Sequence, residues 1–227
     1  MCGRYSLEDV ETNLKLQELL GLVRSRYEDD PRLQDLKTGE IFPSNTVVVL
    51  QGNGPWPMLA KWGLQGFGPS QLLINARAET AAEKPTFRSL VQETRCLFVA
   101  DAFFEWQKKP TADPAKKNKQ KYALAVPGKP LFYMAGLYKP LQSINDSPHG
   151  KIKETEEEAD RLGLPPLPLA CIITTDANNT MSDIHDRMPL ILSSAEAHRW
   201  LTDPDAAMEL LQKPCDVKMQ REAAMQQ

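Results

Sequence analysis

The stretch CLFVADAFFEW, residues 96–106, decides the fold class of this chain. Its aromatic and aliphatic residues, uninterrupted by proline or glycine, predict a buried strand. Comparable runs separated by turn residues predict further strands at 46–50, 58–62, 72–80, 122–126, 131–138, 170–175 and 190–192. The chain should therefore be rich in β-sheet.

Helices are predicted on either side of these strands. Residues 7–24 carry apolar side chains at helical spacing, and Ser6 with Asp9 forms an S-x-x-D capping signature. Two capped helices are expected at 195–201 and 204–212. Strands with flanking helices indicate an α+β protein.

One domain is expected over residues 1–227, because a chain of this length with 41% hydrophobic residues buries a single core of ordinary size. Two segments look like surface loop insertions of opposite charge. The first, residues 108–121, contains six lysines, and the second, residues 141–168, contains a cluster of glutamates.

The charge and composition exclude several classes of protein. A net charge of −3 gives no global positive field, so nucleic acid would have to be bound in a local basic cleft. The chain has no apolar segment of signal-peptide or membrane-spanning length, which predicts a cytoplasmic protein without a membrane partner. The cysteines and histidines lack the spacing of a zinc site or a disulfide framework, so no metal or cofactor is expected.

Cys2 is the first candidate for chemistry. Cytosolic aminopeptidases remove an initiator Met that precedes a small residue, and the mature chain would then carry an α-amine and a thiol on one residue. An α-amine, with a reference pKa of about 7.7 to 8.0, is a far better carbonyl nucleophile at pH 7 than a lysine. Attack on an aldehyde gives a Schiff base, which the thiol closes to a five-membered thiazolidine. A cysteine at position 2 can equally be incidental, and it needs partners to be a site.

Glu105 and His185 are candidate proton carriers. Glu105 lies among aromatic residues that would desolvate its carboxyl group and raise its pKa, although a strand carboxylate can also face solvent or an ion-pair partner. His185 lies in a polar turn between Asp183 and Asp186, where carboxylates hold an imidazole near its working pKa. The same residues would also form a purely structural turn.

Alternation along residues 75–79 would place Asn75, Arg77 and Glu79 on one face of a strand, as a polar site or a stabilising network. Arg77 is also a candidate phosphate ligand, together with Arg4, because a guanidinium binds phosphate in a bidentate manner.

Two aromatic residues, Trp62 and Phe67, are candidate stacking surfaces for an unpaired base. Aromatic residues near turns are more commonly part of a core, so each of these two signals is weak by itself.

Four separated motifs resemble the SRAP family, the SOS response-associated peptidases. They are MCGRY at 1–5, NARAET at 75–80, FEW at 104–106 and IHDRMP at 184–189, in the family's order. The resemblance spans Cys2 to about Leu201. It implies a monomeric single domain built on a curved, largely antiparallel and barrel-like sheet with a DNA channel. It also implies a mature N-terminal cysteine that cross-links to abasic sites in single-stranded DNA and shields them.

The resemblance implies a role for each site residue. Cys2 is the nucleophile, Asn75 positions the N-terminus and the opened sugar, Glu105 transfers the amine proton, His185 protonates the sugar oxygen during ring opening, and Arg4 and Arg77 hold the flanking phosphates. The family's name also implies a thiol autopeptidase that cleaves off its own Met1 with the same residues. A non-catalytic module that binds single-stranded DNA is a third interpretation.

The chain departs from the family pattern in three places. The common Asn-x-Ala-Pro segment appears here as Glu40-Ile41-Phe42-Pro43. After the last helix the chain ends in a polar stretch from Lys218, which predicts that an edge strand is missing or replaced. Where the family has two aromatic residues after the Trp-Gly turn, Phe67 is followed by Gly68, which predicts weaker stacking on DNA.

Overall fold

A ring of strands forms the centre of the molecule. The computed structural model describes residues 2–8, 13–52, 56–68, 71–109, 119–141 and 152–224, with the backbone alone over 152–156. Strand β12 (Leu169–Asp176) pairs with β4 (Trp56–Trp62) and with β11 (Phe132–Lys139), and β3 (Thr46–Gln51) and β8 (Arg95–Ala100) connect these two. The ring is antiparallel except for the β12–β4 pair. A twisted sheet closes in this way without leaving exposed edges.

Three short strands extend this sheet beyond the ring. Strand β7 (Asn75–Arg77) runs parallel to β12, while β13 (Arg187–Pro189) and β14 (Ile191–Leu192) pair antiparallel with β12 and β11. Strands β5 (Leu64–Gln65) and β6 (Leu72–Leu73) form a separate hairpin just before β7.

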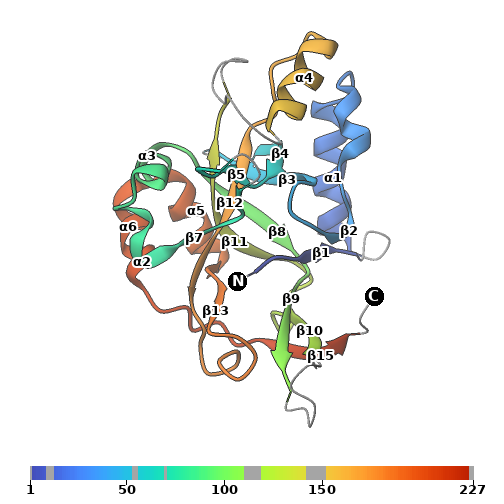
Figure 1. Cartoon of the computed structure of the whole chain (residues 1–227). Coiled ribbons are helices and arrows are strands. Elements are labelled where there is room, and N and C mark those ends of the chain that lie inside the picture. Colours follow the sequence, from blue (N-terminus) through green and yellow to red (C-terminus); the bar gives the residue numbers. More distant parts are fainter. Residues whose placement is uncertain are drawn as a thin grey trace.

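A second, antiparallel sheet lies beside the ring (Figure 1). Its order is β15 (Gln220–Ala224), β10 (Lys119–Ala125), β9 (Ala102–Lys108), β1 (Tyr5–Leu7) and β2 (Gly39–Ile41). The single strand predicted over 96–106 is therefore two strands, β8 and β9, one in each sheet. The break falls at Asp101, whose carboxylate accepts hydrogen bonds from the Ser6 hydroxyl and the Glu8 amide. An uninterrupted apolar run conceals this corner because both strands are buried.

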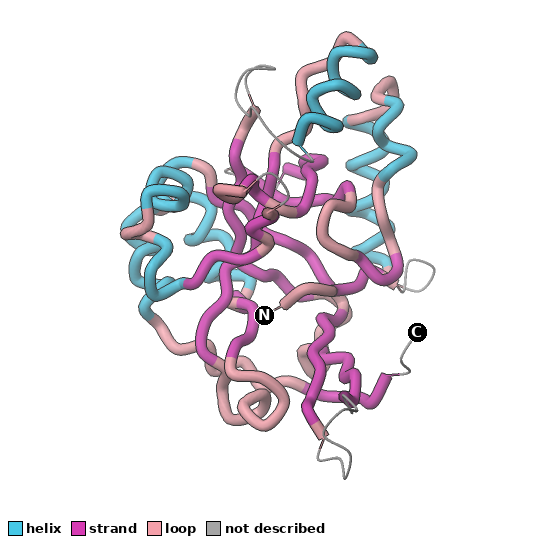
Figure 2. Tube along the Cα trace, in the orientation of Figure 1, coloured by secondary structure: helices cyan, strands magenta, loops and turns pink. Residues whose placement is uncertain are grey.

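Helices lie in two groups on opposite sides of the strands (Figure 2). One group contains α2 (Ala78–Ala81), α3 (Pro85–Glu93), α5 (Ser194–Thr202) and α6 (Pro204–Gln212), and the other contains α1 (Leu14–Arg26) and α4 (Ile152–Leu162). A short 3-10 helix, η1 (Pro31–Asp35), follows α1. The two predicted C-terminal helices are confirmed, and α5 begins with a capping box between Ser193 and Glu196. The α+β fold with a barrel-like, mostly antiparallel sheet is likewise confirmed.

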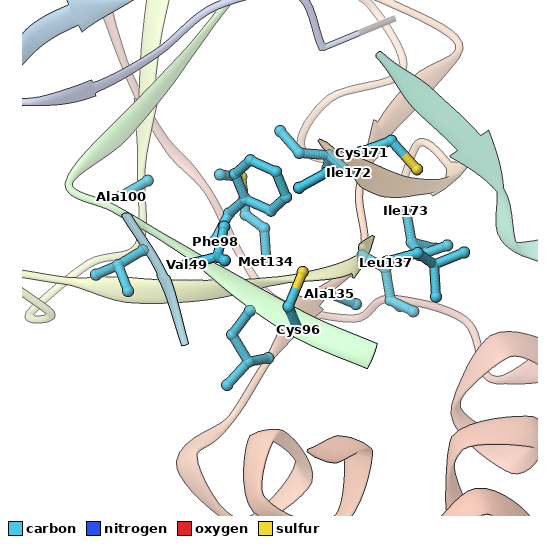
Figure 3. Packing of buried hydrophobic residues seen from close by; sticks show 14 of the residues in the cluster. Val49, Cys96, Phe98, Ala100, Met134, Ala135, Leu137, Cys171, Ile172 and Ile173 are labelled. Atoms are coloured by element: carbon cyan, nitrogen blue, oxygen red, sulfur yellow. The ribbon is translucent and has the colours of Figure 1, made fainter. Parts of the chain in front are cut away.

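The core fills the ring of strands with aliphatic and aromatic side chains (Figure 3). Phe98, Tyr5 and Trp62 are fully buried and meet edge to face, with ring centroids 5.2 to 6.3 Å apart. Gly136 on β11 lies beneath Phe98, and a Cβ there would come within 2.7 Å of that ring. Because Tyr5 belongs to this core, the N-terminal segment is anchored in the interior.

The bounds of two further predicted elements need correction. The helix predicted over 7–24 begins at Leu14, with Asn13 as its N-cap, because Ser6 lies in β1 between two partner strands. Tertiary pairing there overrides the local capping signal. The strand predicted over 72–80 ends at Arg77, and the alanine-rich residues that follow form α2.

One of the predicted loops also needs correction. The segment 141–168 contains α4 and so is partly helical, and the residues of the first insertion between 110 and 118 lie outside the described part. The polar tail supplies an edge strand, since β15 pairs with β10 over residues 220–224, so of the two predicted outcomes the strand is replaced and not missing. No helix among the described residues is long and apolar enough to cross a membrane.

Candidate functional site

Cys2 lies inside the molecule, just before β1. The beginning of the chain is near the middle of Figure 1, close to the strands of both sheets. Cys2 is fully buried, and its thiol donates a weak hydrogen bond to the carbonyl oxygen of Arg4, with 3.7 Å between Sγ and O. Burial, reinforced by the charge of Glu105, raises the pKa of this thiol well above its usual range. The thiol is therefore protonated at neutral pH, and the charge of Glu105 acts on it.

Asn75 fixes the backbone of Cys2. Its side-chain nitrogen donates a hydrogen bond to the Cys2 carbonyl oxygen at 3.0 Å. Asn75 begins β7, which is held in place by its pairing with Ile172 on β12. The side-chain oxygen of Asn75 is buried and has no hydrogen-bond partner among the described residues. A buried acceptor without a partner is uncommon, and it is available to a bound molecule.

Glu105 is a buried carboxyl group on β9. It pairs with Tyr122 of β10 and is only 3% exposed. Desolvation raises its pKa to about 7, so both its protonated and its ionised forms are populated at neutral pH. The sequence-based expectation of a desolvated carboxyl group is confirmed, and a group with this pKa is suited to acid and base catalysis in one cycle.

His185 lies in the loop between β12 and β13, and this loop faces β9. The Gln107 side chain donates to the Asp183 carbonyl oxygen at 2.9 Å, and the charge of Asp186 contributes to the raised pKa of Glu105. The loop is therefore adjacent to the buried carboxyl group. The structure thus brings Cys2, Asn75 and Glu105 together with the His185 loop beside them.

Two contacts compete for Nδ1 of His185. The backbone N–H of Arg187 donates to it at 3.0 Å, which requires an unprotonated Nδ1. The Asp186 carboxylate lies 2.7 Å from the same atom, a contact that is attractive only when Nδ1 carries a proton. Burial lowers the His185 pKa, with Asp186 opposing, so the neutral form prevails at pH 7. The neutral ring satisfies the first contact with its proton on Nε2 and the second with its proton on Nδ1, and in both tautomers it carries one N–H donor.

Glu79 does not share a face with Asn75 and Arg77, contrary to the alternation in the sequence, because it lies in α2. Instead it forms an ion pair with Arg187, Oε2 to Nη2 2.8 Å. Arg187 is 92% buried and also binds the Thr174 carbonyl oxygen and Asp176. This network anchors the backbone whose N–H contacts His185.

The predicted DNA-binding residues have very different environments. Trp62 is completely buried, and its indole N–H donates to the Ile74 carbonyl oxygen, so its proposed role in stacking on DNA is wrong. Phe67 is 95% exposed beside the β5–β6 hairpin. The Arg77 side chain is exposed and makes no hydrogen bond or ion pair within the described part of the chain.

Arg4 is held by three neighbours that the sequence analysis did not assign to the site. Its Nη1 lies 3.1 Å from Glu40, and its Cζ lies 4.6 Å from the centre of the Phe42 ring and 4.9 Å from that of Trp106. In the sequence, Glu40 and Phe42 stood out only because they lie where the chain departs from the family's Asn-x-Ala-Pro segment. Contacts between strands so distant in sequence leave no trace in the local pattern.

The fold and the buried N-terminal cysteine define a protein of the SRAP type. The chain belongs to that family, described as SOS response associated peptidase, whose model matches residues 1–226. It is 32% identical over 227 residues to abasic site processing protein YoqW of Bacillus subtilis, covering 93% of this chain and 87% of that protein. It is 29% identical over 206 residues to abasic site processing protein YedK of Escherichia coli, covering 88% and 79%.

Two further similarities agree with this assignment. Abasic site processing protein HMCES of Xenopus tropicalis is 31% identical over 168 residues, which cover 64% of this chain and 43% of that protein. A crystal structure of a protein from Bacteroides thetaiotaomicron shares the fold, with a TM-score of 0.69 at 24% identity over 99% of this chain and 92% of that one.

Proposed function

We propose that this protein captures abasic sites in single-stranded DNA by forming a thiazolidine between Cys2, once Met1 has been removed, and the aldehyde of the lesion. The observation that carries the proposal is the hydrogen bond from Asn75 to the Cys2 carbonyl oxygen, beside a carboxyl group whose pKa is about 7. The names of the relatives support abasic-site processing as the general function.

The reaction consumes the aldehyde and releases one water molecule. The α-amine of Cys2 adds to the aldehyde carbon to form a carbinolamine. Protonated Glu105 donates its proton to the carbinolamine hydroxyl, which leaves as water and gives the Schiff base. The Cys2 thiol then adds to the same carbon of this protonated Schiff base, forming the carbon–sulfur bond, while Glu105 takes the thiol proton and returns to its protonated form. The ring nitrogen keeps the hydrogen that it carried in the Schiff base. A raised thiol pKa is compatible with this route because the carboxylate removes the proton during the addition.

His185 and Asn75 would act on the sugar before this step. An abasic sugar is mostly a closed ring, and its opening requires a proton on the ring oxygen. Neutral His185 would supply that proton from its ring N–H. The buried side-chain oxygen of Asn75 is available to accept a hydrogen bond from a hydroxyl group of the opened sugar.

A denaturing gel tests the proposal directly. Purified protein is mixed with a single-stranded oligonucleotide that carries one abasic site, with no reducing agent. We expect a conjugate that survives denaturation, and its complete loss in Cys2→Ala. Cys2→Ser keeps the amine but cannot form a thiazolidine, so it should give a conjugate only when borohydride traps the Schiff base. Cys215→Ala, at a cysteine outside the site, is the matched control. Unchanged conjugation by Cys2→Ala would refute the mechanism.

Self-cleavage of Met1 is the alternative use of the same residues, and the buried thiol disfavours it. A peptide bond is attacked by a thiolate, which the raised pKa of Cys2 makes scarce. The mass of protein produced with the host methionine aminopeptidase inhibited distinguishes the two. Retained Met1 would argue against self-cleavage, whereas its removal would argue for it.

A further inference from the structure

Arg4 occupies the middle of a group of residues on the outer face of the second sheet. Arg4 immediately precedes β1, Phe42 immediately follows β2 on one side of it, and Trp106 belongs to β9 on the other side. The guanidinium therefore lies between the two rings, 4.6 and 4.9 Å from their centres. Guanidinium groups stack on aromatic rings through cation–π attraction.

Arg4 shares a carboxylate with a second cation. Glu40 binds Arg4 with one carboxylate oxygen and Lys121 with the other, at 3.1 and 2.7 Å. The Glu40 side chain is only 15% exposed, so solvent screens this contact weakly. Because one carboxylate faces two cations, the group keeps a net positive charge, and the ion pair fixes the Arg4 guanidinium between the two rings.

Phe42 is presented rigidly at the edge of this group. It begins a tight turn in which the Asn45 N–H donates to the Phe42 carbonyl oxygen at 3.1 Å, with Pro43 and Ser44 at the two central positions. Ser44 has a φ of 74°, a strained value for a residue other than glycine. The Asn45 side chain also accepts from the Phe42 N–H at 2.9 Å. The ring is nevertheless 40% exposed, so a fixed backbone presents an open aromatic surface.

We infer that Phe42, backed by Arg4 and Trp106, is a stacking site for the nucleobase next to the abasic nucleotide. Arg4 serves as the central layer of the stack. Arg4 is two residues from Cys2, or about 7 Å along an extended chain, so the adjacent nucleotide reaches it. Stacking on aromatic side chains accepts any base, as a lesion-binding protein requires. This inference rests on the proposed function and identifies the part of the DNA that the site holds.

The test compares binding of oligonucleotides that cannot form a conjugate. Each carries a tetrahydrofuran abasic analogue with adenine on both sides, or with the adenine on one side replaced by a second tetrahydrofuran. We expect Phe42→Ala to weaken binding of the first oligonucleotide at least fivefold, and Phe42→Trp to retain it. For the wild type, removing the stacked adenine should cost a similar factor, whereas for Phe42→Ala that removal should cost nothing more. Trp56→Ala, at another exposed aromatic residue, is the matched control and should leave both affinities unchanged.

The inference is overturned if Phe42→Ala weakens all oligonucleotides equally or has no effect. Circular dichroism of the variant excludes misfolding as the cause of a loss. Failure of this inference would leave conjugation to aldehydic abasic DNA by the wild type intact. Failure of the proposed function would instead appear as unchanged conjugation in Cys2→Ala.

Discussion

The Asn75 side-chain nitrogen lies 3.0 Å from the carbonyl oxygen of Cys2, although 73 residues separate them in the sequence. This contact holds the N-terminal residue at the start of β7. We expect Asn75→Ala to slow conjugation about fivefold, because a hydrogen bond of this kind contributes about 1 kcal/mol. The measurement is the rate of conjugate formation at saturating DNA. Asn179→Ala, at an exposed amide, should leave the rate unchanged, and an equal loss in both variants would contradict a specific role.

Glu105→Gln should remove the pH dependence of conjugation near neutrality. With a pKa of about 7, the wild-type carboxyl group changes its protonation state in this range, and the amide does not. The rate should fall about a hundredfold, in line with the loss of a general acid. The pH–rate profile from pH 5 to 9 measures both effects. An inflection near pH 7 that persists in the variant would assign it to another group.

The same substitution should stabilise the protein at alkaline pH. Burial raises the folded-state pKa of Glu105 from 4.5 to about 7, so the folded protein binds more protons than the unfolded chain between these values. The contribution of Glu105 to stability is therefore most favourable below pH 4.5 and is lost as the pH rises to about 7. Relative to the wild type, Glu105→Gln should gain about 2 to 3 kcal/mol between pH 5 and pH 8. Urea unfolding at the two pH values measures this gain, with exposed Glu83→Gln as the control.

His185→Gln should separate ring opening from the later steps. Because His185 would protonate the sugar oxygen, the variant should form conjugates with abasic DNA about a hundredfold more slowly. Its reaction with an open-chain aldehyde such as propionaldehyde, followed by mass spectrometry, should proceed at the wild-type rate. Slower reaction with both aldehydes would place His185 in a different step. His198→Gln, at an exposed histidine, is the matched control.

Arg77→Gln should lower the salt dependence of DNA binding. Arg77 is exposed, so its charge is available to a phosphate. Loss of one phosphate contact to a single strand reduces the slope of log affinity against log salt by about 0.7. Titrations between 50 and 200 mM salt measure the slope. Arg88→Gln, at an exposed arginine on α3, should change neither the affinity nor the slope.

Much of the fold was predictable because its strands are local patterns. Residues 46–50 and 131–138 have the composition of buried strands, and β3 and β11 occupy almost the same residues. The N-terminal residues were assigned wrongly, because Ser6 resembles a helix cap and becomes a strand residue only through pairing with Glu40 and Ala102. The corner at Asp101 was also missed, since a strand that changes sheets keeps its apolar composition.

The candidate site was predictable to the extent that its chemistry resides in single residues. Cys2 carries two nucleophiles once Met1 is removed, and this follows from the sequence alone. The motif around Glu105 predicted a desolvated carboxyl group, and the pKa of about 7 agrees with it. The sequence did not predict which aromatic residues are exposed. Trp62 and Phe67 are both aromatic residues near a glycine, yet Trp62 is fully buried and Phe67 is almost fully exposed.

The sequence by itself determined the family, the strand-rich α+β class and the aminothiol that the mature N-terminus would carry, because each is encoded in residue identity or short-range spacing. Only the tertiary structure decided which side of β9 buries Glu105, that Asn75 meets Cys2, and that Glu40 binds Arg4 between two rings. These relationships depend on which strands pair and in what register. Pairing is set by the burial of the whole core, to which every strand contributes and which no single segment specifies.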